Sequence, residues 1–464
     1  GGTNASKQFK TANYFQRRYE EMKFSKLLLA AVFAFVMTAG ALMAADEPLE
    51  IHGGGRIGWV VNSKGGSHGL AGTDNRMGRY PNHAETNYYC LWFSKKTTAE
   101  SGAWSKVTFG IDKWNGNPSN DLANVSWRLR GFNVEFGALD FLPQGASIKA
   151  GLFGLSQGWN DAQDFGPGPN FSGIGTGITG LGGMVGIYYM AQDSNQNDGA
   201  AADGKYPTDN WQTVKGLGER TMHSFVMTVS NPMVDVIGGF GFAKAPKEAD
   251  AGTAKEDNLT AFAVGAIAKL PMGGLNIFAQ LANNNWAIQL EDGNADDTVL
   301  KNTTFEAGNA DVGQKKAYKA FCAKVGLYSV TDLGDGMYIA PAAFYQYFKA
   351  GKDSIVSDGS GEDRVTNKIR ATAKFSKALT QNIAFAPALG YARTWTDASG
   401  DKATQSIQVT AGIEMGLNTG YWAGQKIQIY ASYVNVNKEL KDDGGAFDGK
   451  SNRLYAGTYV TFGF

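Results

Sequence analysis

The stretch QSIQVTAGIEMGL, residues 405–417, decides the fold because apolar and polar side chains alternate along it without a break. One set is apolar: Ile407, Val409, Ala411, Ile413, Met415 and Leu417. The other set is polar or small: Gln408, Thr410, Gly412, Glu414 and Gly416. Successive side chains of a β-strand point to opposite faces, so one face of this strand suits lipid and the other suits water. The pattern predicts a strand in a wall between an apolar and an aqueous phase.

The next two runs repeat this alternation. The first places Ile427, Ile429, Ala431 and Tyr433 opposite Gln428, Tyr430 and Ser432. The second places Leu454, Ala456, Val460, Phe462 and Phe464 opposite Arg453, Tyr455, Gly457, Tyr459, Thr461 and Gly463. A last strand that ends on an outward Phe is similar to the terminal signature of bacterial outer-membrane proteins.

Strand patterns of this kind extend along the chain, and the connections between them alternate in length. The predicted strands cover residues 50–61, 86–97, 103–114, 125–140, 146–154, 174–181, 183–193, 222–230, 233–245, 257–270, 274–284, 316–330, 336–350, 364–376, 382–396, 405–417, 425–437 and 451–464. The predicted long connections are 62–85, 155–173 and 285–315, and the predicted short ones are 97–102, 231–232, 271–274 and 377–381. A soluble β-sandwich also alternates, but turns at one end and long loops at the other are typical of a membrane barrel. We therefore predict an all-β fold, a transmembrane antiparallel β-barrel of about 18 strands with both termini in the periplasm.

Glycine and aromatic residues are both abundant, which is unusual for ordinary strands. The chain has 61 glycines and 12% aromatic residues. A membrane barrel uses both, because glycine fits crowded lumen-facing positions and aromatic rings form girdles at the membrane interfaces. The 43 basic residues balance the 43 acidic ones, so no electrostatic footprint for a nucleic-acid partner exists.

The N-terminal residues predict export to the bacterial outer membrane. Two lysines follow Met22 and precede a long apolar run, and small residues precede an acidic pair, with cleavage expected near Ala44 or Ala45. An uncleaved anchor is the competing interpretation, because the run is nearly long enough to span a bilayer. The predicted divisions are an upstream extension (1–21), a signal peptide (22–45) and a single outer-membrane β-barrel domain (46–464).

A barrel of this size predicts a pore. An open sheet edge in hydrocarbon would leave backbone groups unpaired at several kcal/mol each, so the sheet must close. About eighteen strands enclose more space than side chains fill, so a water channel for small polar solutes results. We expect no cofactor and no metal, because Cys90 and Cys322 lie far apart in strand-like runs. We expect no enzyme, because no nucleophile motif adjoins the four histidines, His52, His68, His83 and His223.

The third external connection, residues 155–173, has the composition of a structured insert. It carries aromatic and acidic residues among glycines and prolines: Trp159, Asp161, Asp164, Phe165 and Phe171. One interpretation is a loop folded into the lumen, where it selects solutes. The other is an external loop whose aromatic residues pack onto neighbouring loops.

Four segments resemble the maltoporin family of sugar-specific porins. They are LEIHGGGRIGWVVN (49–62), RMGRYPNHAETNYY (76–89), RGFNVEFGALDFLPQGASIKAGLFG (130–154) and DFGPGPNFSGIGTG (164–177). Order and spacing agree over the mature chain, and the similarity is densest in its first third. The resemblance implies an eighteen-stranded homotrimeric porin whose third loop folds into the lumen, with an aromatic slide and polar tracks that guide maltodextrins.

The resemblance assigns lumen positions to several charged residues. Arg56, Arg76 and Arg130 match lumen arginines of the family, and Asp164 followed by Phe165 matches an acidic-aromatic pair in its constriction loop. With Asp161, these residues could exchange hydrogen bonds with successive sugar hydroxyls. Alternatively, such charges only solvate the wall and balance one another.

Most aromatic residues of the slide that the resemblance implies are missing from this sequence. Gly54, Asn87, Gly166 and Gly463 stand where the resemblance leads us to expect slide aromatics. The candidate sugar-stacking residues are Tyr89, on the face of Asn87, Trp114, which could reach a neighbouring subunit, and Phe375. Phe375 shares its parity with Ile369, Ala371 and Ala373 and therefore points toward lipid unless its strand bulges. We predict a porin for passive diffusion of carbohydrates, with the preferred sugar open. The alternatives are a general diffusion porin and a structural or adhesive barrel.

Overall fold

A computed structural model gives the arrangement of the chain. It describes residues 47–63, 87–115, 128–156, 168–193, 221–243, 259–271, 274–284, 286–287, 290, 320–350, 363–397, 403–417, 425–441 and 450–463. The strands are β1 (Glu50–Asn62), β2 (Asn87–Thr98), β3 (Trp104–Asn115), β4 (Arg128–Gly137), β5 (Ser147–Ser156), β6 (Asn170–Leu181), β7 (Val185–Asp193), β8 (Thr221–Ser230), β9 (Val234–Ala243), β10 (Leu259–Lys269), β11 (Asn276–Asn283), β12 (Ala320–Tyr328), β13 (Thr331–Gly334), β14 (Met337–Ala350), β15 (Arg364–Ala378), β16 (Ile383–Phe385), β17 (Ala388–Thr396), β18 (Thr404–Gly416), β19 (Lys426–Val436) and β20 (Asn452–Gly463). A short helix, α4 (Lys438–Lys441), follows β19.

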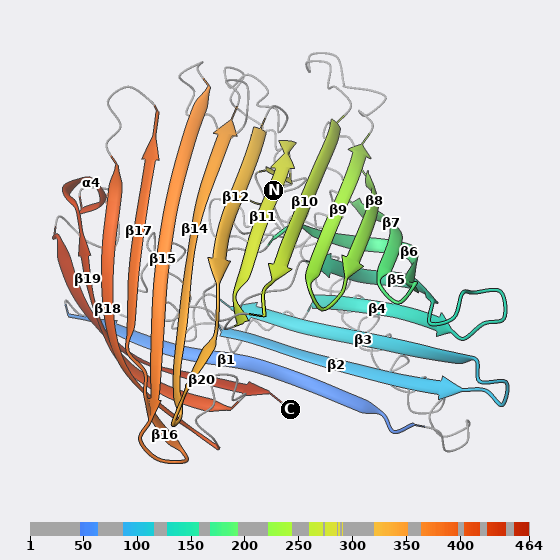
Figure 1. Ribbon diagram of the computed structural model, residues 1–464, viewed down its shortest axis with the longest axis horizontal. Helices are drawn as coiled ribbons and strands as arrows, with labels where there is room; N and C mark the ends of the chain where they lie inside the picture. Colours follow the sequence, from blue (N-terminus) through green and yellow to red (C-terminus); the bar gives the residue numbers. More distant parts are fainter. Residues whose placement is uncertain are drawn as a thin grey trace, which may run out of the picture.

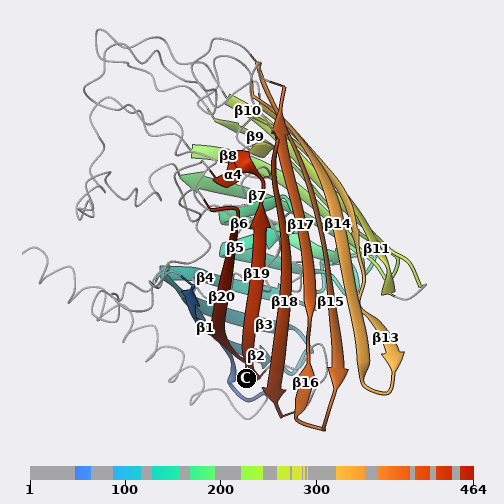
Figure 2. The same cartoon turned by 90° about the vertical axis from the view of Figure 1, so that its left-hand side faces the viewer.

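The strands form one closed antiparallel sheet. Each strand pairs with its neighbours in the chain, and β1 pairs with β20, so the sheet has no free edge. Two of the barrel strands are interrupted. Segments β12 and β13 do not pair with each other but both pair with β14, and segments β16 and β17 both pair with β15 and β18. Counted as one strand each, β12–β13 and β16–β17 make this an 18-strand barrel. Strands β1 to β4 cross the direction of β14 to β18 at a steep angle, as tilted strands on different walls of a barrel do (Figures 1 and 2).

Exposure alternates along the strands as the sequence predicts. In β19 every second residue is buried, and Ile427, Ile429 and Tyr433 between them are exposed. In β18 the buried row runs through Ser406, Gln408 and the polar residues after them, while the alternating apolar row faces outward. The polar face therefore lines the interior and the apolar face covers the outside, which confirms the predicted transmembrane barrel.

The two ends of the barrel differ. Short turns join β2 to β3, β8 to β9 and β10 to β11, and we call this rim the turn end. Long connections follow β1, β3, β5, β7, β9 and β11, and we call that rim the loop end. In the β8–β9 turn the side-chain oxygen of Asn231 accepts the backbone N–H groups of Met233 and Val234, both at 2.8 Å. Such a side chain replaces the missing ladder bonds of a tight turn.

Two of the differences from the predicted strand boundaries have a clear physical reason. β6 begins at Asn170 instead of residue 174, and Phe171 pairs with Leu155 of β5, so residues 170–173 belong to the wall and not to the third connection. The predicted strand over residues 382–396 is interrupted between β16 and β17, where Pro387 lies. Proline has no N–H to donate, so it breaks the ladder locally.

Glycine and aromatic residues occur together on the interior face. The Trp92 ring lies over Gly110 and Gly131 of the next two strands, so closely that a Cβ on either glycine would overlap it. The same relation joins Trp104 to Gly137, Tyr188 to Gly177 and Gly186, Phe171 to Gly239, and Phe278 to Gly326. The glycines are therefore needed where large rings lie against the wall, which is the crowding that the composition predicts.

Candidate solute pathway in the barrel interior

The interior face divides into a polar sector and an apolar sector. The polar sector comes from β11, β12, β14, β15 and β18 to β20 and comprises Gln280, Lys324, Gln346, Arg370, Lys374, Gln408, Glu414, Lys426, Gln428 and Arg453. The apolar sector comes from β5 to β9 and comprises Phe153, Phe171, Tyr188, Met190, Met222, Val226 and Ile237. Each set follows from the period-two alternation of its strands, because antiparallel partners place their side chains on the same face.

A charged cluster lies in the polar sector toward the turn end. Glu414 forms an ion pair with Lys374, and its second oxygen lies 3.5 Å from Lys426 Nζ. Gln428 also donates to Glu414. The side chains of Glu414, Lys426 and Lys374 are only 5%, 8% and 12% exposed. This carboxylate therefore compensates two buried ammonium groups.

A second polar contact set surrounds Phe344 on β14. Lys324 Nζ lies 5.5 Å from the centroid of this ring, and Arg370 Cζ lies 5.6 Å from it. Lys324 also donates to the backbone carbonyl of Leu290 at 3.1 Å. A ring face attracts cations, so Phe344 holds both cationic side chains at the interior wall.

The residues after β11 enter the interior. Trp286, Ala287 and Leu290 are almost fully buried and belong to the same cluster as the apolar sector. The Trp286 ring lies edge-on to Phe171, with centroids 4.9 Å apart. The bond from Lys324 to Leu290 ties this segment to the polar sector as well. Trp286, Ala287 and Leu290 therefore pack against the interior wall, which the sequence did not predict.

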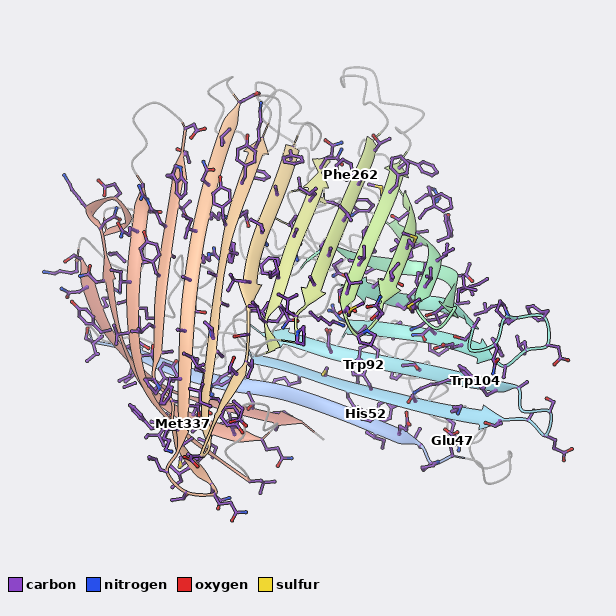
Figure 3. The ribbon with its side chains drawn as sticks, in the orientation of Figure 1. Glu47, His52, Trp92, Trp104, Phe262 and Met337 are labelled. Carbon is purple, nitrogen blue, oxygen red and sulfur yellow. The ribbon has the colours of Figure 1, made fainter. Side chains whose placement is uncertain are left out.

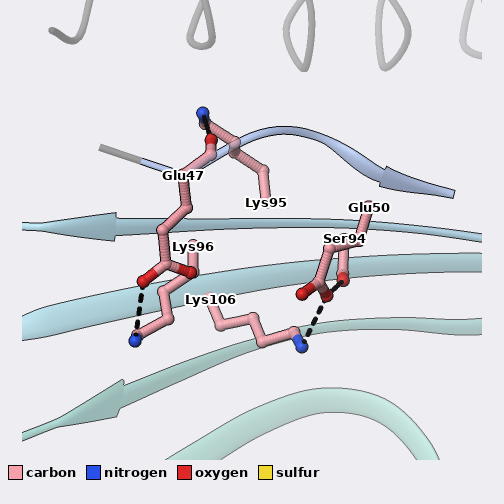
Figure 4. Close-up of polar contacts among 6 residues, drawn as sticks. All are labelled: Glu47, Glu50, Ser94, Lys95, Lys96 and Lys106. Carbon is pink, nitrogen blue, oxygen red and sulfur yellow. Dashed lines mark hydrogen bonds and ion pairs between the residues drawn. The ribbon is translucent and has the colours of Figure 1, made fainter. Parts of the chain in front are cut away.

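A charged network joins β1, β2 and β3 at the turn end (Figure 4). Glu47 pairs with Lys96 at 2.9 Å, and Glu50 pairs with Lys106 at 3.1 Å. Ser94 donates to Glu50 at 2.6 Å. Glu47 lies just before β1, and Trp92 and Trp104 lie on the neighbouring strands (Figure 3). The network ties the start of the barrel to its second and third strands.

Arg130 lies at a β-bulge between β3 and β4. The pairing shifts between Gly110 and Ile111, which leaves Arg130 without an opposite residue. Its Nε lies 3.4 Å from Oδ2 of Asp112, whose side chain is fully buried. Asp112 shares the interior row of Gly110, so the bulge directs a predicted lumen arginine to an interior carboxylate.

The remaining predicted polar residues lie outside the described residues or are described only in their backbone. Arg56 pairs with Thr461 of β20, and Trp114 pairs with Tyr88 of β2, but neither side chain is described. Arg76, Asp161, Asp164 and Phe165 lie outside the described residues. The inward fold of the third connection and its constriction therefore stay predictions.

Two candidate stacking residues lie in outward-facing rows. Tyr89 pairs with Gly55, and its ring centroid is 6.3 Å from that of Phe462, whose row is the apolar outer row of β20. Phe375 pairs with Ile339 and shares the parity of Ala373, which pairs with the exposed Leu389. Among the described residues, the pairing of β15 shows no bulge that would turn the Phe375 side chain to the interior.

Sequence reasoning missed the aromatic residues that do face the interior. Tyr430, Tyr455 and Tyr459 are nearly fully buried in the interior rows of β19 and β20. Their signal was present, because period-two parity already placed them opposite the lipid-facing residues. Trp286 had no such signal, because it follows a strand end where periodicity stops.

Metal and redox chemistry find no support in the described part of the chain. No cluster of three potential ligands from His, Cys, Asp and Glu occurs there. Cys90 and Cys322 are not linked by a disulfide bond. Within the same residues, no helix has the length and hydropathy of a membrane span.

Comparisons with known proteins found one matching family and several solved porin structures. The sequence profile of the LamB porin family matches residues 49–462. No curated protein matches the chain. Among solved structures, an anion-selective porin from Comamonas acidovorans matches with 13% identity and a TM-score of 0.42, over 90% of this chain and 99% of that one. OmpF of Salmonella typhi in complex with daunomycin matches with 11% identity and a TM-score of 0.41, over 90% and 97%.

A closed antiparallel barrel with an apolar outside and a polar interior is the architecture of outer-membrane porins. Porins are channels. Because the profile match covers most of its length, the chain belongs to the LamB porin family.

Proposed function

We propose that this porin conducts sugars passively along the interior face described above. The observation that carries the proposal is the division of that face into a polar sector with glutamine, lysine and arginine side chains and an apolar sector with aromatic rings. A sugar has hydroxyl groups at its edge and C–H groups on its ring faces. A lining that offers both kinds of contact suits such a solute, and charged side chains exchange hydrogen bonds with it as it moves.

Within this proposal, the predicted polar residues keep their roles. Arg56, Arg76 and Arg130 form part of the polar track, and Asp161, Asp164 and Phe165 form the constriction of the third connection. Tyr430, Tyr455 and Tyr459 lie in inward rows, whereas Tyr89 and Phe375 lie in outward rows, so the aromatic residues on the interior side come from the first set.

The proposal includes a cellular setting. A signal peptide over residues 22–45 directs export, the barrel domain begins at residue 46, and residues 1–21 take no part. The loop end faces the exterior and both termini of the barrel lie in the periplasm, because short turns face the periplasm in this class. The active form is a homotrimer in which Trp114 reaches the neighbouring lumen. Unheated gel samples should therefore run far above the monomer, and a monomer band under all mild conditions would contradict the assembly.

Planar-bilayer conductance tests the transport function. The protein should form ion-conducting channels, and maltose or maltodextrins added to one side should reduce the current in a concentration-dependent way. Conductance without any block by sugars would identify a general diffusion porin. Absence of conductance from a correctly folded, heat-modifiable barrel would overturn the pore and favour a structural or adhesive role.

A further inference from the structure

A cationic and aromatic patch lies on the outer face at the loop end of β14, β15 and β17. We call it the β14–β17 outer patch, and it consists of Tyr345, Tyr347, Lys349, Asn367, Arg393 and Trp395. The register places Tyr345 beside Ile369 and Arg393 beside the same residue from the other side. Asn367 lies between Tyr347 and Trp395 in the next outward row. Lys349 lies one outward row further, opposite Val365. The six residues therefore occupy adjoining outward rows, in which Asn367 is only 7% exposed.

Direct contacts hold the patch together. The guanidinium of Arg393 lies 5.3 Å from the centroid of the Trp395 ring, and the centroids of Tyr345 and Trp395 are 6.4 Å apart. The Tyr345 hydroxyl donates to Asn367 Oδ1 at 2.6 Å. The Arg393 guanidinium therefore lies against aromatic rings that contact one another, while the Arg393 side chain remains exposed.

Lys349 adds a second cation at the edge of the patch. Its Nζ lies 2.9 Å from Asp363 Oδ2, and both side chains are about half exposed, at 43% and 49%. A half-exposed pair is weak and exchanges readily with another anion. Lys349 can thus turn toward a phosphate that binds beside it.

An arginine on the lipid-facing surface is unfavourable unless it lies near a membrane interface. A charged side chain facing the bilayer centre costs about 2–4 kcal/mol, and this cost falls toward zero at the interfaces. Tyrosine and tryptophan prefer the same interfacial level. The Arg393 guanidinium is consequently placed among lipid headgroups, and its planar fork matches a phosphate better than a point charge does.

We propose that the β14–β17 outer patch is a binding site for the phosphate of an anionic lipid headgroup. Arg393 donates two hydrogen bonds to the phosphate, Lys349 contributes a second positive charge, and the aromatic rings lie against the upper part of the acyl chains. The site is on the outer surface and does not depend on which solute the lumen conducts.

Native mass spectrometry of the assembled protein in detergent tests this site with phosphatidylglycerol as the probe. The wild-type protein should bind the lipid, and Arg393→Gln should weaken its apparent affinity roughly tenfold, because one charge-assisted interaction is lost. Arg393→Lys keeps the charge and should bind phosphatidylglycerol with intermediate affinity. This result would show that the loss in Arg393→Gln does not come from a folding defect. Lys377→Gln is the matched control, since Lys377 is an outer-row cation at the turn end that donates to the Asp335 carbonyl at 2.9 Å.

Each alternative result has a definite meaning. Unchanged lipid binding by Arg393→Gln, or an equal loss in Lys377→Gln, would overturn the site. Competition by inorganic phosphate at the same concentration would also overturn it, by showing a free-anion site. Dissociation of the assembly in Arg393→Gln without loss of lipid would show that a second copy of the chain covers the patch. Channel conductance of Arg393→Gln should match the wild type, so a failure of the transport function remains distinguishable.

Discussion

The buried cluster around Glu414 offers the sharpest test of the interior. Glu414→Gln keeps the size of the side chain and its amide can still bond, but it removes the negative charge that faces Lys374 and Lys426. Two ammonium groups, each at most 12% exposed in its side chain, would then face each other without compensation. Removal of one partner from a buried ion pair costs about 3–5 kcal/mol. We expect a loss of about 3 kcal/mol, since an aqueous lumen nearby screens part of the charge.

Equilibrium unfolding of the barrel in lipid vesicles, followed by tryptophan fluorescence, measures this loss. The matched control is Glu50→Gln, which removes the same charge from a half-exposed pair with Lys106. That transition should stay near the wild-type position, because solvent screens exposed pairs. A second variant, Glu414→Gln with Lys374→Met, removes one of the two opposed charges and should recover part of the loss. Equal, small effects of Glu414→Gln and Glu50→Gln would refute the reasoning and show that water reaches the Glu414 cluster freely.

Three further predictions concern the lumen. Trp286→Ala should raise single-channel conductance, because the ring that packs against Phe171 in the interior is removed; unchanged conductance would contradict an inward position of Trp286 in the channel. Arg130→Glu should shift the reversal potential in a salt gradient toward cation selectivity, and Asp112→Asn should shift it the other way; an unchanged reversal potential in both variants would place the pair outside the ion path. Gly110→Ala should cost about 1–3 kcal/mol and lower conductance, because the new methyl group overlaps the Trp92 ring, as a denaturation curve and a bilayer recording would show.

Much of the fold could be predicted because one face of each barrel strand contacts lipid and the other faces water, and this difference appears in the sequence as alternating apolar and polar residues. In β18 to β20 most outward residues are apolar and most polar residues point inward, so the period and the face follow together. The start of β6 could not be predicted in this way. Its first residues follow a Gly-Pro repeat that is typical of loops, and only pairing with β5 makes them a strand.

The candidate site was less predictable for a different reason. In β2, NYYCLWF carries aromatic residues on both faces, so composition does not say which row faces the lumen. The register with β1 and β3 decides it, and Tyr89 falls in the outer row. Trp286 depends wholly on tertiary packing, because its partners Phe171 and Gly241 are distant in the chain.

The rings that lie flat over glycines have a consequence for the calibre of the channel. A large side chain usually narrows a pore, but here Trp92, Tyr188 and Phe278 occupy space that missing Cβ atoms leave in the wall. The width of the passage is therefore set as much by the glycines as by the rings. A single added methyl group beneath a ring would tilt it outward from the wall and into the water column. Small substitutions at glycine positions, rather than exchanges of the aromatic residues themselves, are the natural means by which such a channel changes the size of the solutes that it admits.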